Sequence, residues 1–141
     1  MAARVDRTLL RILDANLNRA REGLRVCEDV ARLGYDDAGL TARLKRVRHG
    51  ITAAARRLPV AWRALLMARG SDRDIGRRTG HLVSQRGGSL QTLFVVNMQR
   101  AKEAMRVLEE SCRIIAPIVA RDFARLRFRL YALEKRFAQG R

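Results

Sequence analysis

Cysteine, proline, aromatic residues and acidic residues are all scarce in this 141-residue chain. The two cysteines, Cys27 and Cys112, lie among apolar neighbours in helical patterns, which favours buried, reduced thiols over a disulfide or a nucleophile. No apolar run approaches the roughly 18 residues of a membrane span, and the first residues form no hydrophobic signal segment. We therefore expect a cytoplasmic protein that does not act at a membrane.

Strand signals are also missing, because aromatics make up only 5% of the residues and no alternating β-branched segment of useful length occurs. Apolar residues instead recur at helical steps of three and four. This periodicity covers five segments, at 8–33, 38–58, 60–67, 89–115 and 117–137. Capping residues stand at the expected starts: Asp6, Asp36 or Asp37, and Ser89. Gly34 can end the first segment, and in the short third one Trp62 is expected on the buried side.

The charge of the chain is strongly one-sided, with 30 Lys and Arg against 14 Asp and Glu and a formal net charge of +16. Such a balance favours polyanionic partners: nucleic acid, phosphorylated small molecules or acidic membranes. It does not choose among them. The planar fork of arginine suits bidentate phosphate contacts, although an arginine excess can also reflect a genome rich in G and C.

One charged helical segment occurs twice, at 16–32 and 97–113. Eight of the seventeen positions are identical, and both copies read N-x-x-R-A-[RK]-E-x-x-R-V-x-E-[DE]-x-x-R. Exposed charges usually vary freely because changing them costs little stability. Since the charges match here, we infer that they have a task.

The repeat extends beyond this motif, because residues 125–130 (RLRFRL) echo residues 46–51 (RVRHGI). The chain is therefore predicted to be an all-α helical bundle of two related helical hairpins with internal pseudo-twofold symmetry. It forms a single domain over 1–141, with repeat 1 at about 7–58, a loop at 69–88 and repeat 2 at about 89–138. An isologous homodimer is a further expectation.

Each copy contains a ladder of five polar residues spaced three apart, in the order Asn, Arg, Glu, Arg and Glu. A step of three residues falls short of a full helical turn, so the ladder winds backwards around the helix by roughly 60° per step. Asn16 and Asn97 then fall on the core face, with Arg19 and Arg100 beside them. If the two motif helices face each other, these arginines and the glutamates Glu22 and Glu103 converge on one polar cavity that suits phosphates or a divalent metal. The alternatives are core amides that fix helix register and salt bridges on a solvated helix.

The loop at 69–88 carries five of the ten glycines and has no sustained hydrophobic period. A loop of this length inside a compact domain is usually functional or disordered. Asp72 and Asp74 could face a metal, and Gly87-Gly88-Ser89 at a helix start could seat a phosphate. Turn formation is the alternative for both. The sequence contains no Walker motif, zinc-spaced Cys/His cluster or Ser/His catalytic arrangement.

Three segments together resemble a known family: residues 12–29 (ILDANLNRAREGLRVCED), 68–76 (ARGSDRDIG) and 97–110 (NMQRAKEAMRVLEE). It is the monofunctional hydroxymethylpyrimidine-phosphate kinase family, whose domain is often fused ahead of thiamine-phosphate synthase. The resemblance implies an enzyme that transfers the γ-phosphoryl of ATP to 4-amino-5-hydroxymethyl-2-methylpyrimidine phosphate, giving the diphosphate used in thiamine biosynthesis. ATP would be the phosphoryl donor and Mg²⁺ the metal.

The resemblance also suggests roles for individual residues. Phosphoryl transfer needs positioning and charge neutralisation more than a strong base. The expected catalytic residues are Arg19, Glu22, Arg100 and Glu103. The expected substrate- and phosphate-binding residues are Asn16, Arg25, Arg69, Asp74, Gly76, Asn97 and Arg106, with Asp74 also a candidate Mg²⁺ ligand.

Three other functions remain open. The chain could be a non-catalytic partner that binds the pyrimidine phosphate and delivers it to a separate thiamine-phosphate synthase. It could be a helical enzyme that uses arginines on another anionic metabolite, as chorismate mutases do. It could also be a basic nucleic-acid-binding bundle, although the repeated glutamates weaken that hypothesis.

Overall fold

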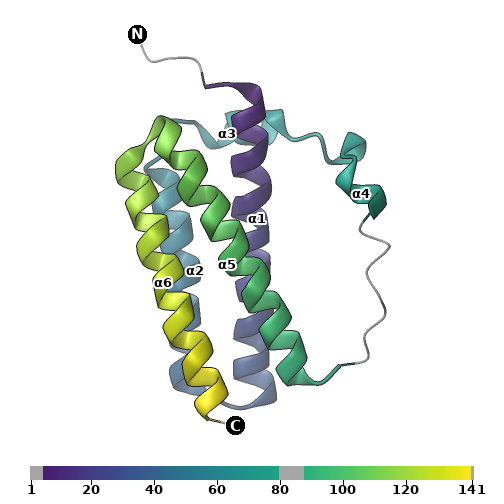
Figure 1. Cartoon of the computed structure of the whole chain (residues 1–141), viewed down its shortest axis with the longest axis vertical. Helices are drawn as coiled ribbons and strands as arrows, with labels where there is room; N and C mark the ends of the chain where they lie inside the picture. Colours follow the sequence, from purple (N-terminus) through teal and green to yellow (C-terminus); the bar gives the residue numbers. More distant parts are fainter. Residues whose placement is uncertain (1–4, 80–87, 141) are drawn as a thin grey trace.

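Four long helices form the body of the molecule. The computed structural model describes residues 5–79 and 88–140, and its long helices are α1 (Arg7–Asp29), α2 (Ala38–Arg56), α5 (Leu90–Ile115) and α6 (Pro117–Gln139). Each packs antiparallel to two neighbours, because α1 contacts α2 and α5, and α6 contacts the same two helices (Figure 1). The predicted all-α bundle is confirmed.

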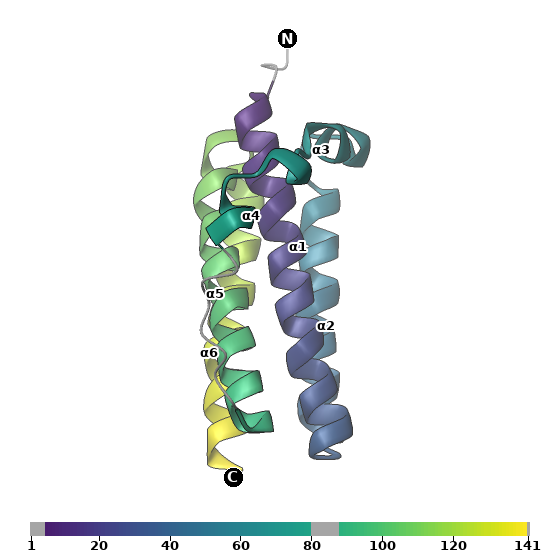
Figure 2. The ribbon, with the colours of Figure 1, turned by 90° about the vertical axis from the view of Figure 1, so that its right-hand side faces the viewer.

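Shorter elements connect the two hairpins. One turn of π-helix, η1 (Val30–Gly34), prolongs α1 up to the glycine that was expected to end it. After α2 come α3 (Trp62–Ala68), η2 (Ser71–Arg73) and α4 (Gly76–Thr79), with α3 against α1 (Figure 2). The segment expected to lack periodicity thus contains two short helices, because a single turn is too brief to leave a periodic pattern.

The helix starts follow the sequence closely. Asp6 accepts a hydrogen bond from the Thr8 amide at 3.2 Å, and Asp37 accepts one from the Leu40 amide at 2.9 Å. Ser89 caps α5 in the same way. These side chains satisfy amides that have no carbonyl partner in the first helical turn, so three predicted caps are confirmed.

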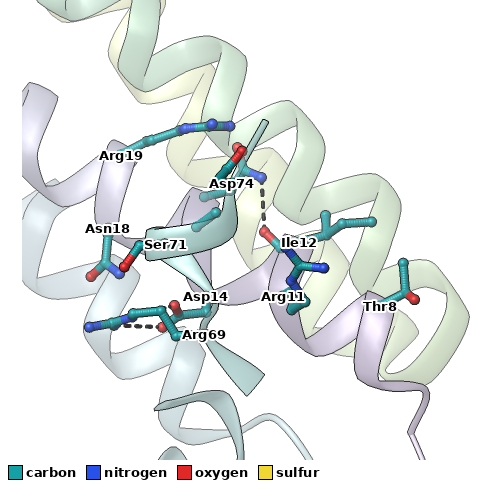
Figure 3. A pocket seen from close by; sticks show the side chains of 12 residues that line it. Thr8, Arg11, Ile12, Asp14, Asn18, Arg19, Arg69, Ser71 and Asp74 are labelled. Atoms are coloured by element: carbon teal, nitrogen blue, oxygen red, sulfur yellow. Dashed lines mark hydrogen bonds and ion pairs between the residues drawn. The ribbon is translucent and has the colours of Figure 1, made fainter. Parts of the chain in front are cut away.

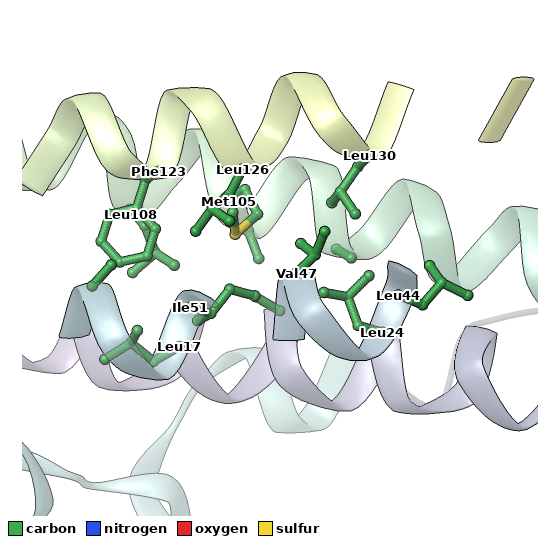
Figure 4. Close-up of a cluster of buried hydrophobic side chains, with 14 of the residues drawn as sticks. Leu17, Leu24, Leu44, Val47, Ile51, Met105, Leu108, Phe123, Leu126 and Leu130 are labelled. Carbon is green, nitrogen blue, oxygen red and sulfur yellow. The ribbon is translucent and has the colours of Figure 1, made fainter. Parts of the chain in front are cut away.

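Apolar side chains from all four long helices fill the space between them (Figure 4). Apolar residues of α6 face inward, and Phe137 stacks on Phe94 of α5 with ring centroids 3.7 Å apart. Trp62 was predicted to be buried and is 74% exposed, because α3 turns Leu65 toward the core instead. None of the helices within the described ranges combines the length and apolar character needed to cross a bilayer.

The two hairpins repeat each other in detail. The amide of Asn16 donates to the Ile12 carbonyl at 2.9 Å, and the amide of Asn97 donates to the Leu93 carbonyl at the same distance. The two motif copies also agree in solvent exposure: nearly every residue that is identical in both copies is buried in both or exposed in both. The arrangement therefore has the predicted pseudo-twofold relation between α1–α2 and α5–α6.

The helices α1 and α5 approach closely where their motif copies cross. A Cβ atom on Gly23 would lie 2.9 Å from the carbonyl oxygen of Asn97 and 3.4 Å from the Cβ of Ala101, a contact no other residue can make without displacing a helix. The Cys27 thiol also donates to the Phe94 carbonyl at 3.4 Å. Small residues thus bring the two copies of the motif together.

Candidate functional site

A groove of about 520 Å³ runs between α1 and α5 and is lined symmetrically by the two motif copies. Five equivalent positions of each copy contribute. They are Asn16, Arg19, Glu22, Gly23 and Val26 from α1, and Asn97, Arg100, Glu103, Ala104 and Val107 from α5. The predicted convergence of the two ladders on one polar cavity is confirmed.

The guanidiniums of Arg19 and Arg100 face the groove. Among the described residues, 5–79 and 88–140, neither side chain forms a salt bridge or a hydrogen bond. Glu103 accepts a hydrogen bond from Gln99 at 3.1 Å, which holds its carboxylate beside the groove. Two unpaired guanidiniums in one groove favour an anionic ligand, since each offers a bidentate fork to phosphate or carboxylate oxygens.

The asparagines at the floor of the groove keep part of their hydrogen-bonding capacity. Asn16 and Asn97 are both buried, and each uses one amide hydrogen on the carbonyl four residues earlier in its own helix. These bonds lie within one helix and do not connect α1 to α5. Each amide retains an oxygen acceptor and a second hydrogen, the groups that could read the edge of a heterocycle.

A second pocket of about 420 Å³ adjoins the groove, and Asn16 and Arg19 line both. Its outer wall is the segment after α3, with Arg69, Ser71 and Asp74 (Figure 3). This places the predicted loop residues next to the predicted helix residues, although they are fifty or more positions apart in sequence.

An ion pair between a buried carboxylate and an exposed arginine fastens this segment to α1. Arg69 donates to both carboxylate oxygens of Asp14, from Nε at 2.7 Å and from Nη2 at 2.8 Å. Asp14 is only 8% exposed, and its hydrogen bonds and charge raise the pKa of Arg69. Sequence reasoning missed Asp14 and Arg11, because both lie away from the apolar stripe of α1 and nothing in the sequence signals that a segment after α3 covers them.

Three predicted binding residues lie outside both pockets. Arg25 contacts Glu28 and Asp29, and Arg106 contacts Glu109 and Glu110, all as ion pairs within one helix. The backward winding of the ladder explains this, since each further step turns the side chain away from the groove. Gly76 closes a turn, in which its amide donates to Asp74 at 2.8 Å. A binding role for these three residues stays a prediction that neither pocket supports.

The last glutamate of each ladder holds its hairpin together. Glu28 accepts from Arg48 of α2 at 2.7 and 3.2 Å, and Glu109 accepts from Arg127 of α6 at 2.9 and 3.1 Å. The alternative of salt bridges along the helix is present at both glutamates, in the pairs Arg25–Glu28 and Arg106–Glu109, but these carboxylates are buried, at 5% and 4% exposed, and not solvated. The repeated charges therefore have two separate tasks, one in the groove and one in packing.

Metal and thiol chemistry find little support in the site. Among the residues with described positions, no group of three or more His, Cys, Asp or Glu side chains could hold a metal ion. Asp74 is exposed and occupied by the Gly76 amide, so its predicted role as an Mg²⁺ ligand has no supporting geometry, and Gly87 of the predicted phosphate seat lies outside the described residues. Burial raises the pKa of both thiols, Cys27 and Cys112, to about 12, which agrees with the expectation that neither is a nucleophile.

Comparison with known proteins supplies the family. The model of the ThiD2 family matches residues 11–136, which is most of the chain. The chain belongs to the ThiD2 family. No solved structure matches it.

The curated relatives of this ThiD2 chain carry the name thiamine-phosphate synthase. The protein of Nostoc punctiforme is 35% identical over 132 residues, which are 92% of this chain and 35% of the relative. That of Thermosynechococcus vestitus is 39% identical over 127 residues (90% and 34%), and that of Rhodopirellula baltica 37% over 128 residues (89% and 33%). The chain thus spans about a third of the length of these relatives.

These names correct the kinase assignment. The relatives are named thiamine-phosphate synthase and not hydroxymethylpyrimidine-phosphate kinase, so the expected kinase activity is not supported. The expectation of ATP as phosphoryl donor loses its basis with it. The catalytic roles of Arg19, Glu22, Arg100 and Glu103 depended on phosphoryl transfer, whereas their position in the groove does not.

Proposed function

We propose that this ThiD2 chain works in thiamine biosynthesis as a non-catalytic helical partner of thiamine-phosphate synthase, and that it binds an aminopyrimidine phosphate in the groove between α1 and α5. The observation that carries the proposal is the convergence of both motif copies on this one groove. The names of the relatives support the pathway, and their greater length supports a partnership with a larger catalytic unit.

The chemistry of the groove suits such a ligand. Arg19 and Arg100 offer unpaired guanidiniums to a phosphate, which is the anion that a fork of N–H donors binds best. Asn16 and Asn97 offer an amide oxygen and an amide hydrogen, which complement the amino group and ring nitrogens of an aminopyrimidine. Glu22 and Glu103 limit the net charge of the groove and can orient the arginines.

Isothermal titration calorimetry with 4-amino-5-hydroxymethyl-2-methylpyrimidine phosphate, in the absence of ATP, tests this proposal. We expect saturable binding by the unmodified chain and a loss of about tenfold or more in affinity for Arg19→Gln and for Arg100→Gln, since each removes a charged hydrogen bond to the ligand. Arg32→Gln is the matched control, because Arg32 ends the same motif copy, is exposed and lines neither pocket.

Failure of the unmodified chain to bind the pyrimidine phosphate would overturn the proposal. If it binds, sedimentation of the chain with a separate thiamine-phosphate synthase then tests the partnership, and we expect a complex that the pyrimidine phosphate strengthens. The same runs on the chain alone test the homodimer, which stays a prediction.

One observation favours a second candidate function, the binding of nucleic acid. A groove of about 540 Å³ on the opposite side, between α2 and α6, is flanked by Arg43, Arg46 and Arg129, and no carboxylate is among its described lining residues. Phosphate backbones bind such surfaces with affinities that fall steeply with salt. Fluorescence anisotropy with a single-stranded RNA at two salt concentrations checks it, and the absence of a salt-dependent signal excludes it.

A further inference from the structure

The second hairpin contains an ion pair whose counterpart in the first hairpin is incomplete. Lys102 of α5 donates to Glu134 of α6 at 2.6 Å, and both side chains are largely buried. Lys102 occupies the motif position that Arg21 holds in the first copy. The pseudo-symmetry therefore predicts a carboxylate on α2 opposite Arg21.

The register of the hairpins identifies the residue that stands there. Glu28 of α1 pairs with Arg48 of α2. Arg21 lies seven residues before Glu28, and Ala55 lies seven residues after Arg48, so these two positions face each other in the same register. The same steps from the Glu109–Arg127 pair lead to Lys102 and Glu134. Ala55 thus replaces the glutamate that would complete the first pair.

This replacement leaves one donor of the Arg21 side chain without an acceptor among the described residues. Its Nε is buried and donates no hydrogen bond to any residue at 5–79 or 88–140. Burial lowers the pKa of Arg21, and the charge of Asp14 offsets this only in part. A buried donor without an acceptor is costly, so its persistence needs an explanation.

A cavity of about 610 Å³ lies at this position, between α1, α2 and α3. Arg21 and Arg56 provide positive charge in its lining, and Trp62 and Leu65 provide an apolar wall. Asp14, Asn18 and Arg69 separate it from the pocket of Figure 3, and it shares no lining residue with the groove between α1 and α5.

We propose that this cavity binds a small organic anion, whose carboxylate or phosphate takes the place of the missing glutamate against Arg21 while a flat apolar body packs on Trp62. Arg56 adds a second guanidinium at the mouth of the cavity. An aromatic ring stacked on indole and an anion held by guanidinium forks are each common modes of recognition. The proposal does not depend on the function of the groove.

The chain carries its own reporter for this site, because Trp62 is its single tryptophan. Tryptophan fluorescence is followed during titration with benzoate, with phenyl phosphate and with inorganic phosphate, which lacks the apolar body. We expect saturable quenching by at least one aromatic anion, at concentrations about tenfold or more below those needed for inorganic phosphate, since only the former gains from ring stacking. The aromatic probe that binds tighter shows whether the cavity prefers a carboxylate or a phosphate.

Two variants link the signal to the missing partner. Ala55→Glu supplies the carboxylate that Glu134 provides in the second hairpin, so we expect it to pair with Arg21, abolish probe binding and raise the melting temperature. Ala53→Glu is the matched control, with the same charge change at an exposed position of the same helix outside the cavity, and should leave binding unchanged. Arg21→Met should also abolish binding, and it serves if Ala55→Glu fails to fold.

The proposal is overturned if the unmodified chain gives no saturable response to either aromatic anion. It is equally overturned if Arg21→Met, or a folded Ala55→Glu, binds the probes as tightly as the unmodified chain. Loss of binding in Ala53→Glu to the same degree as in Ala55→Glu would also overturn it, since that result would reflect net charge and not the cavity.

Discussion

Replacing Glu109 with glutamine tests whether the last glutamate of the ladder holds the hairpin α5–α6 together. Its carboxylate is 4% exposed and accepts hydrogen bonds from Arg127 at 2.9 and 3.1 Å and from Arg113 at 3.1 Å. Glutamine keeps the shape but removes the charge, and it leaves the buried guanidinium of Arg127 without its counterion. Removing one partner of a buried pair costs about 3–5 kcal/mol.

We expect a loss near the lower end of that range, about 3 kcal/mol, because Arg127 also donates to the hydroxyl of Tyr131 at 3.1 Å and keeps that partner. For a chain of this size, that corresponds to a fall of roughly 10 °C in melting temperature. Glu28→Gln should cost less, about 2 kcal/mol, because the Arg48 side chain is 21% exposed, against 11% for Arg127, and regains water more easily.

Urea denaturation followed by far-UV circular dichroism measures these changes as differences in the free energy of unfolding. The matched variants are Glu22→Gln and Glu103→Gln, which change the exposed carboxylates of the groove and should stay within about 0.5 kcal/mol of the unmodified chain. The double variant Glu109→Gln with Arg127→Met should recover much of the loss, because no unpaired charge remains buried.

The reasoning is refuted if Glu109→Gln costs less than about 0.5 kcal/mol, or if the groove variants cost as much as it does. Either result would mean that burial and pairing do not separate the two kinds of glutamate. The charges of the ladder would then need a common explanation.

Three further predictions address other parts of the molecule. Gly23→Ala should lower the free energy of unfolding by about 1–3 kcal/mol despite the better helix propensity of alanine, because the new methyl group meets the Asn97 carbonyl, and urea denaturation measures this. The buried thiols of Cys27 and Cys112 have a pKa of about 12, so at about pH 8 roughly one thiol in ten thousand is ionised, whereas about a quarter of the thiols are ionised in an unfolded chain. A thiol-reactive dye should therefore label both cysteines only on unfolding. Asp14→Asn removes the charge that holds Arg69, so limited proteolysis at 69–79 should become several-fold faster, and unchanged cleavage would contradict a fastening role.

The helices could be predicted closely because their signals are local. Asp6, Asp37 and Ser89 mark the starts, and the apolar period marks the buried face. The groove could be predicted because two copies of one motif must meet in a pseudo-symmetric bundle. The segment after α3 could not be placed on α1 in this way, because its contact depends on a single long-range ion pair.

The burial of Asp14 and Glu28 could not be predicted for a related reason. A helical wheel assigns one apolar stripe to α1, whereas the helix has three neighbours, α2, α3 and α5, which cover part of its polar face as well. The exposure of Trp62 has the same origin, because in a helix as short as α3 the choice of inward residue is made by what it packs on. Tertiary contacts thus decide these positions.

Each of the two buried glutamate–arginine pairs lies within one hairpin, while the groove lies between the two hairpins. This is the arrangement expected if two identical hairpins, once a dimer, were joined into one polypeptide. In a dimer of identical hairpins, every substitution appears on both sides at once. In a single chain each side can change alone, as Ala55 and Glu134 illustrate. Duplication therefore gives this protein a repeated framework in which one half can acquire a cavity that the other half lacks.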